Sequence, residues 1–171
     1  MKLYHGSNVE IFKVELEKCM PHKDFGKGFY TTTLEEQAWR MAKRRAATEG
    51  GNPVVTIFEI PDELLLEKGL NCRVFSDKPS VEWAVFVKNN RDKRFEDISS
   101  PECNLDGKYD IVVGPVADDT IGLLVRQFQR GLIDEKYLTE GFSFDKVTNQ
   151  YTFHTENALK YLEKVGVKYD E

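Results

Sequence analysis

The chain has few cysteines and no long apolar run. Cys19, Cys72 and Cys103 are odd in number and widely spaced along 171 residues, which disfavours a disulfide framework and is typical of a reducing compartment. No apolar run approaches the ~20 residues that a membrane helix needs. The first five residues also lack the charged, apolar and small segments that make up a signal peptide. We therefore expect a cytoplasmic protein without a membrane partner.

An excess of positive charge is also missing. The 24 lysine and arginine residues are outnumbered by 29 aspartate and glutamate residues, so the formal net charge is −5. This balance disfavours nucleic-acid binding by bulk electrostatics. The basic cluster formed by Arg40 and residues 43–45 is more typical of a solvated helix face than of a nucleic-acid site.

The length and composition fit one domain with a sizeable core, since 40% of the residues are apolar and 12% are aromatic. Short β-prone segments alternate with segments of helical periodicity, without repeats or linkers, which predicts an α+β fold with a single domain over residues 1–171. The predicted strands cover residues 2–5, 28–32, 54–58, 109–113 and 150–154. The predicted helices run between Thr33 and Gly50, over residues 79–90, from Asp118 or Asp119 to about Gly131, over residues 134–140, and after Thr155. A capping box of Thr33 and Glu36 is expected to begin the first helix.

Two glycine-containing segments are the first candidates for a functional site. His5 and Gly6 end the first predicted strand, where a lone histidine is more often structural than functional. In residues 25–32, two glycines two positions apart allow a close backbone approach, and Tyr30 follows them at the edge of a sheet. A glycine-rich turn before a strand explains this segment equally well. Rossmann and Walker fingerprints are excluded, because the third glycine or the Gly-Lys-Ser ending that they need is missing.

The third candidate segment covers residues 149–156. The alternation of a strand places Gln150, Thr152 and His154 on one face and two aromatic residues on the other. If the aromatic face is buried, the polar face lines a cleft or meets solvent. A hydrogen-bonded structural role for His154 is about as plausible as an orienting role toward an acceptor or a phosphate.

In this order, the three segments resemble motifs of the ADP-ribosyltransferase superfamily of the diphtheria-toxin and poly(ADP-ribose) polymerase type. In that family a His-Gly pair closes the first strand, a Gly-x-Gly-aromatic-Tyr segment enters a later strand, and an Asn-Glu-Tyr-like segment opens a C-terminal strand. Here the positions are held by His5-Gly6, residues 26–30 and residues 149–151. Nearly the whole chain also resembles a small bacterial branch of the superfamily, DUF3990. The resemblance implies an ADP-ribosyltransferase-like split β-sheet core with inserted helices.

The resemblance also implies NAD⁺ as co-substrate and a mono-ADP-ribosyltransferase activity toward a protein or nucleic-acid acceptor. The backbone of Gly6 would bind the nicotinamide carboxamide, and His5 would hold the adenosine-side ribose. Tyr30 would stack on the nicotinamide ring, a contact worth on the order of 1–2 kcal/mol when it is desolvated. The other cofactor-binding residues implied by the motif surround this tyrosine: Gly28, Phe29 and Thr31.

The sequence departs from the family pattern at Gln150, where a glutamate is expected. Cleavage of the nicotinamide–ribose bond leaves positive charge on the ribose, and nearby negative charge lowers the barrier. A unit charge pair ~4 Å apart at an effective dielectric of ~20 is worth about 4 kcal/mol, or about a thousandfold in rate. Either another acid supplies the charge, with Glu156, Asp118 and Asp119 as candidates, or Gln150 acts alone and slowly, or the chain binds NAD⁺ without catalysis. Helix capping and the helix dipole explain all three acids equally well.

An RNA-directed relative, which modifies nucleic acid or removes a phosphate from RNA, is a further alternative, although the acidic balance counts against it. Acceptor choice in such enzymes lies in loops near the cleft, and residues 21–25 and 92–107 are the candidate loops.

Overall fold

The computed structural model describes residues 1–117, 119–142 and 149–170. These residues form seven strands and five α-helices, with two short 3₁₀ helices. The strands are β1 (Lys2–Ser7), β2 (Phe29–Thr32), β3 (Val54–Glu59), β4 (Cys72–Val74), β5 (Ile111–Pro115), β6 (Asn149–Phe153) and β7 (Glu163–Tyr169). The helices are α1 (Glu35–Glu49), α2 (Val81–Arg91), α3 (Asp119–Gln129), α4 (Glu135–Gly141) and α5 (Glu156–Leu159), and the 3₁₀ helices are η1 (Leu16–Lys18) and η2 (Leu64–Leu66).

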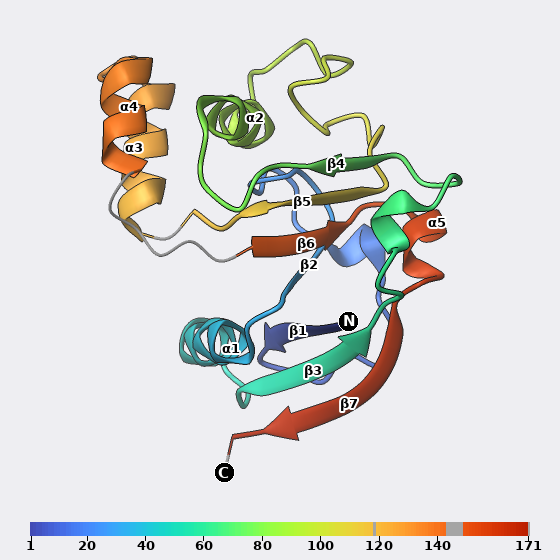
Figure 1. Cartoon of the computed structure of the whole chain (residues 1–171). Helices are drawn as coiled ribbons and strands as arrows, with labels where there is room; N and C mark the ends of the chain where they lie inside the picture. Colours follow the sequence, from blue (N-terminus) through green and yellow to red (C-terminus); the bar gives the residue numbers. More distant parts are fainter. Residues whose placement is uncertain (118, 143–148, 171) are drawn as a thin grey trace.

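All seven strands belong to one mixed sheet with the order β4-β5-β6-β2-β1-β3-β7. Only β4 and β5 run parallel among these neighbours. The contact between β1 and β2 is short, since it contains one registered pair, Tyr4 with Thr32, whereas β1 and β3 are paired along residues 2–7. The sheet therefore divides into two groups of strands that meet at β1 and β2 (Figure 1).

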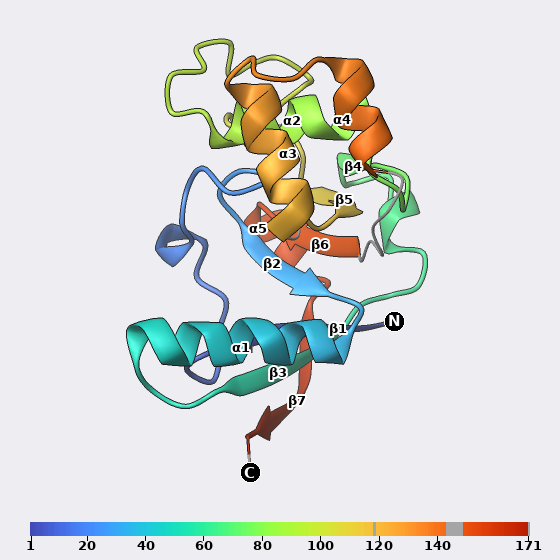
Figure 2. The same ribbon diagram turned by 90° about the vertical axis from the view of Figure 1, so that its left-hand side faces the viewer.

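Each group of strands has its own helical cover. Helix α1 lies along β1 and β3, whereas α2, α3 and α4 gather beside β4, β5 and β6 (Figures 1 and 2). The core between α2–α4 and the sheet contains large buried side chains, including Trp83, Phe86 and Val112. A second core on the opposite face of the sheet contains Phe29 and Phe153. The α+β class expected from the sequence is confirmed by this arrangement.

The start of α1 differs from the prediction. The helix begins at Glu35, and its N-cap, Leu34, makes no side-chain capping bond, so the predicted capping box is wrong. The hydroxyl of Thr32 takes over this role: it accepts a hydrogen bond from the Leu34 backbone N–H over 3.1 Å and donates one to Oε1 of Gln37 over 2.7 Å. The predicted end is confirmed, because Gly50 follows the helix with a φ of 81°, a conformation that favours glycine.

The C-terminal part differs more strongly from the prediction. The final helix is only the short α5, and the chain then forms β7 at the edge of the sheet. Strand β4 is also missing from the predicted set, because three residues carry too little periodicity to be recognised. The other predicted strands and helices are confirmed, with ends shifted by one or two residues. The three cysteines are unpaired.

Candidate functional site

The three strands that carry the motif residues are neighbours. His5 lies on β1, Tyr30 on β2 and Gln150 on β6, and these strands are consecutive in the sheet. Thr32 of β2 is in register with Tyr4 on one side and with Gln150 on the other. His5, Tyr30 and Gln150 therefore all lie within two positions of a single row across three strands.

His5 and Tyr30 nevertheless occupy opposite faces of the sheet. Side chains alternate along a strand, so Phe29 and Tyr30 point to opposite sides. The His5 ring stacks on Phe29 with 4.3 Å between ring centroids, whereas Tyr30 packs in the core beneath α2–α4. The two residues meet through the backbone, because Nδ1 of His5 lies 2.7 Å from the carbonyl oxygen of Tyr30.

The surroundings of His5 keep its ring neutral. Burial lowers its pKa from 6.5 to about 4, although the bond to the Tyr30 carbonyl partly opposes this shift. Because a carbonyl only accepts hydrogen bonds, Nδ1 carries the proton and Nε2 is left as an acceptor. Within the described residues, Nε2 has no hydrogen-bond partner. His5 can therefore accept a hydrogen bond from a hydroxyl at neutral pH.

The hydroxyl of Tyr30 closes the turn that precedes β2. It accepts a hydrogen bond from the Phe25 backbone N–H over 2.9 Å and donates one to the Gly26 carbonyl over 2.7 Å. Burial raises the pKa of this hydroxyl well above its ordinary value of 10, so it stays protonated. These bonds give Tyr30 a structural role that the sequence did not indicate.

Both predicted cofactor-binding glycines lie where the backbone is closely covered. A Cβ at Gly6 would lie 1.8 Å from the carbonyl oxygen of Ala38 in α1, and a Cβ at Gly28 would lie 2.6 Å from Nδ1 of His154. His154 itself donates through Nδ1 to the Lys27 carbonyl over 2.8 Å, and burial lowers its pKa to about 4. Close packing thus accounts for glycine at both positions.

The remaining predicted cofactor-binding residues are buried. Phe29 belongs to the core on the His5 face of the sheet, and its ring packs on Phe58. The hydroxyl of Thr31 donates to the Tyr151 carbonyl over 2.8 Å and so joins β2 to β6. Both side chains are therefore engaged within the protein.

Gln150 lies in a cluster that the sequence analysis missed. Its Nε2 donates to Oδ2 of Asp24 over 3.2 Å and to the Pro115 carbonyl over 3.3 Å. Asp24 in turn forms an ion pair with Arg91, whose Nε donates to Oδ1 of Asp24 over 2.9 Å. A carboxylate thus lies beside the side chain that occupies the expected glutamate position.

Asp24 is held from several sides. Nδ2 of Asn90 donates to the Asp24 carbonyl over 3.2 Å, and Nδ1 of His22 lies 3.2 Å from the Asn90 carbonyl. The next residue, Phe25, is completely buried under α2. The segment before the two glycines is therefore anchored on the end of α2.

Among the acids proposed from the sequence, Glu156 makes no hydrogen bond or ion pair with Gln150 or Asp24 in the described structure. Glu156 is exposed at the start of α5, after the N-cap Thr155, and six residues further along the chain than Gln150. Asp118 lies outside the described residues, and Asp119 begins α3. Within the described chain, Asp24 is the acid that contacts Gln150.

Two shallow cavities lie away from this cluster. One, of about 460 Å³, is bordered by residues 132–140 around α4, and the other, of about 390 Å³, lies between residues 59–61 and 160–163. Neither is lined by the predicted site residues. The residues that the structure describes contain no cluster of three histidine, cysteine or acidic side chains able to hold a metal ion.

A family model for proteins of unknown function, DUF3990, matches residues 1–164. The chain belongs to the DUF3990 family. No curated protein matches it. None of the helices in the described parts of this DUF3990 chain has the length and apolar character that a membrane span requires.

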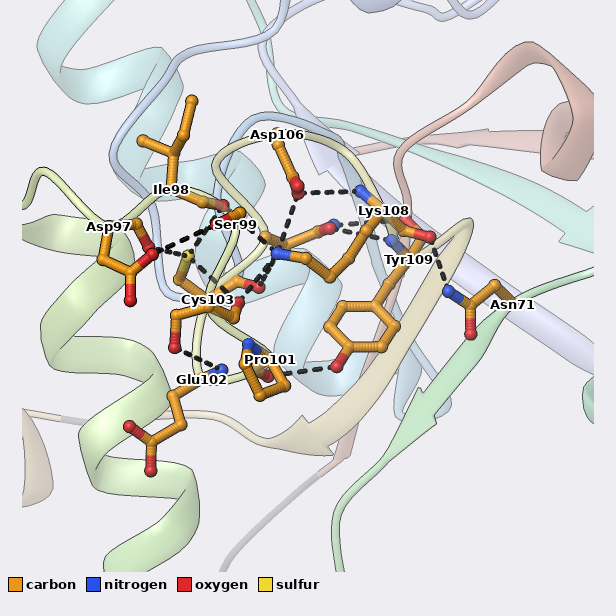
Figure 3. Close-up of polar contacts among 12 residues, drawn as sticks. Asn71, Asp97, Ile98, Ser99, Pro101, Glu102, Cys103, Asp106, Lys108 and Tyr109 are labelled. Carbon is orange, nitrogen blue, oxygen red and sulfur yellow. Dashed lines mark hydrogen bonds and ion pairs between the residues drawn. The ribbon is translucent and has the colours of Figure 1, made fainter.

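One of the two candidate loops of this DUF3990 chain is organised around a lysine. Nζ of Lys108 donates to the carbonyls of Ile98, Ser100 and Cys103 over 3.2, 2.8 and 3.2 Å, and it pairs with Asp106 over 2.8 Å (Figure 3). The loop at residues 92–107 is therefore a folded unit, although its sequence is charged and irregular. The same loop reaches the Asp24 anchor through Asn104, whose backbone N–H donates to Oδ1 of Asn90 over 2.8 Å.

Proposed function

We propose that the protein is an NAD⁺-dependent mono-ADP-ribosyltransferase that transfers ADP-ribose to a protein or nucleic-acid acceptor. The observation that carries the proposal is the adjacency of β1, β2 and β6, which brings three motifs from distant parts of the sequence to one region of the sheet. The short contact between β1 and β2 supports a split sheet of the ADP-ribosyltransferase type.

The residues have distinct roles in this proposal. The backbone of Gly6 binds the nicotinamide carboxamide, and Nε2 of His5 accepts a hydrogen bond from the adenosine-side ribose. The Tyr30 ring lies on the other face of the sheet from His5, so in this proposal the nicotinamide meets it at the place where β1 and β2 separate. The orientation of the ring is set by the hydroxyl bonds to the preceding turn. Oε1 of Gln150 accepts a hydrogen bond from a hydroxyl of the nicotinamide-side ribose.

The reaction exchanges one bond at the ribose for another. The electrons of the bond between the ribose carbon and the ring nitrogen leave with nicotinamide, which becomes neutral, and the positive charge moves to the ribose. A nucleophile of the acceptor then bonds to this carbon and releases its proton. Water serves as the acceptor when no macromolecule is present, so the release of nicotinamide measures the chemical step.

The test is incubation of the purified chain with NAD⁺ and quantification of free nicotinamide by chromatography. We expect release by the wild-type protein and a strong reduction in Gln150→Ala. Gln127→Ala, on α3, removes the same side chain away from the motifs and is expected to keep the wild-type rate.

Two other outcomes would contradict the proposal. Calorimetric binding of NAD⁺ without release of nicotinamide would favour an NAD⁺-binding module, the alternative suggested by glutamine at position 150. If the chain neither bound NAD⁺ nor released nicotinamide, NAD⁺ would be removed from consideration as its substrate or ligand.

A further inference from the structure

A carboxylate contacts Gln150 from a segment far away in the sequence. Oδ2 of Asp24 lies 3.2 Å from Nε2 of Gln150, across 126 positions of the chain. We infer that Asp24 is a positioning residue that supplies, through Gln150, the negative charge that a glutamate would bring at that position. This inference rests on the proposed function and specifies how the site works without the glutamate.

The hydrogen bonds of Gln150 fix the direction of its amide. Both partners of Nε2, the Asp24 carboxylate and the Pro115 carbonyl, are acceptors, so the NH₂ group must face them. The amide oxygen is then directed away from Asp24 and accepts no hydrogen bond from any described residue. Gln150 keeps 7% of its surface exposed, and its oxygen is set as an acceptor for an incoming hydroxyl.

The carboxylate of Asp24 divides its two oxygens between two partners. Oδ1 accepts from Arg91, and Oδ2 accepts from Gln150. The guanidinium lies on the Oδ1 side of the carboxylate, and Oδ2 is the oxygen that faces Gln150. Donation from the amide to a carboxylate also increases the negative charge on the amide oxygen, because linked hydrogen bonds polarise one another. The amide oxygen therefore meets a cationic ribose with more negative charge than an isolated glutamine offers.

The position of Asp24 is fixed by its neighbours. Asn90 holds its carbonyl, the next residue is buried in the core, and the Tyr30 hydroxyl accepts from the N–H of that next residue. The side chains of Asp24 and Arg91 are 15% and 24% exposed, so water screens their charges only partly. These contacts distinguish the pair from a mobile surface ion pair.

The first measurement compares the kinetics of Asp24→Asn with those of the wild type, with nicotinamide release as the readout. Asparagine keeps the size of the side chain and removes the charge. We expect kcat to fall by about tenfold or more, while KM for NAD⁺ stays within about threefold. The reason is that the charge of Asp24 stabilises the cationic ribose formed during bond cleavage, and not the uncharged ribose of bound NAD⁺. Asp106→Asn, which breaks an ion pair of similar burial with Lys108, is the matched control and is expected to keep the wild-type kcat.

The second measurement asks whether a charge placed directly at position 150 replaces the one lost. We expect Gln150→Glu to restore kcat in the Asp24→Asn background to the wild-type value or above. In the single variant Gln150→Glu two carboxylates share the site, which raises the pKa of one of them. The rate of the single variant should therefore titrate at a higher pH than that of the double variant.

If Asp24→Asn does not fold, the pair Asp24→Asn/Arg91→Met tests the same point, because it removes both charges and leaves no unpaired guanidinium. We expect the same tenfold or greater loss of kcat from this variant. Variants within twofold of the wild-type kcat, or a double variant Asp24→Asn/Gln150→Glu that stays as slow as Asp24→Asn, would overturn the inference while leaving the proposed function intact. A wild-type protein that releases no nicotinamide would overturn both.

Discussion

Nδ1 of His5 donates a hydrogen bond to the backbone carbonyl of Tyr30 over 2.7 Å, at the place where β1 and β2 separate. A side chain thus takes the place of a backbone partner between the two groups of strands. The ring is also stacked on Phe29 and is largely removed from water. His5 therefore contributes to folding as well as to the proposed binding of ribose.

Acidification should destabilise the protein through two histidines. Burial lowers the pKa values of His5 and His154 from 6.5 to about 4. Above pH 6.5 both rings are neutral in the folded and in the unfolded protein. Between pH 6.5 and 4 the rings take up protons in the unfolded chain but stay neutral in the folded one. The free energy of unfolding should therefore fall over this interval, by up to about 3 kcal/mol for each ring. Urea unfolding at a series of pH values measures the loss.

His154→Gln provides the comparison for this pH series. The amide can still donate to the Lys27 carbonyl, but it does not titrate. Between pH 6.5 and 4, the loss of unfolding free energy that comes from histidine protonation should be about half as large in the variant as in the wild type, because one of the two rings is gone. Identical slopes in the two proteins between pH 6.5 and 4 would contradict the assignment.

Substitution of Gly6 by alanine should severely destabilise the fold. The new Cβ would lie 1.8 Å from the Ala38 carbonyl oxygen and 2.9 Å from the Ala42 backbone nitrogen, so α1 would have to move away from β1. Overpacking typically costs about 1–3 kcal/mol, and contacts with rigid backbone fall at or above the upper end of that range. Thermal unfolding of Gly6→Ala measures the effect.

Gly69→Ala is the control for this substitution. Nothing lies within 4 Å of a Cβ at Gly69, so the change should be neutral or should stabilise the protein by about 0.4–1 kcal/mol. A Gly6→Ala protein as stable as Gly69→Ala would show that α1 does not pack on β1 as described. A loss of NAD⁺ turnover in Gly6→Ala alone would not reveal a binding role, since the fold itself depends on this glycine.

Local elements were predictable from the sequence because their signals are local. The end of α1 follows from the glycines at 50 and 51, and the strand at β3 follows from an apolar run between two prolines. Strand β7 was missed because it is an edge strand with lysines and a glycine among its few apolar residues, so its pairing with β3 decides its conformation.

The candidate site was only partly predictable, because long-range contacts leave no local signal in the sequence. The motif supplied His5, Tyr30 and Gln150, but Asp24 and Arg91 become relevant only through contacts across 67 and 126 positions. No spacing rule links such residues within one sequence. The structural roles of Gly6 and the Tyr30 hydroxyl were likewise invisible, because they depend on which segments pack against them.

Removal of the Tyr30 hydroxyl should cost stability without removing the aromatic ring. In Tyr30→Phe the Phe25 N–H and the Gly26 carbonyl lose their partner, and unpaired buried groups cost about 1–3 kcal/mol. We expect a lower midpoint in urea unfolding, and NAD⁺ binding that persists where the variant is folded. Tyr137→Phe, at a position 58% exposed, should have little effect. Equal midpoints for the two variants would argue against the hydroxyl contacts.

Replacement of Lys108 by methionine should loosen the loop at residues 92–107. Its ammonium group satisfies three backbone carbonyls and pairs with Asp106 (Figure 3). Hydrogen bonds to a charged group contribute about 1.5–3 kcal/mol, so Lys108→Met should lower the free energy of unfolding by about that amount. Hydrogen exchange followed by mass spectrometry should show faster exchange in this loop and little change in β1 and β3.

Lys93→Met is the matched control, because Lys93 is an exposed lysine of the same loop. We expect it to change stability by no more than about 0.5 kcal/mol and to leave the exchange pattern of the loop unchanged. The loop reaches the Asp24 segment through Asn104 and Asn90, so Lys108→Met should also increase exchange in residues 22–26. Faster exchange confined to residues 92–107 would show that the loop and the Asp24 segment open independently, and that the position of Asp24 does not depend on this loop.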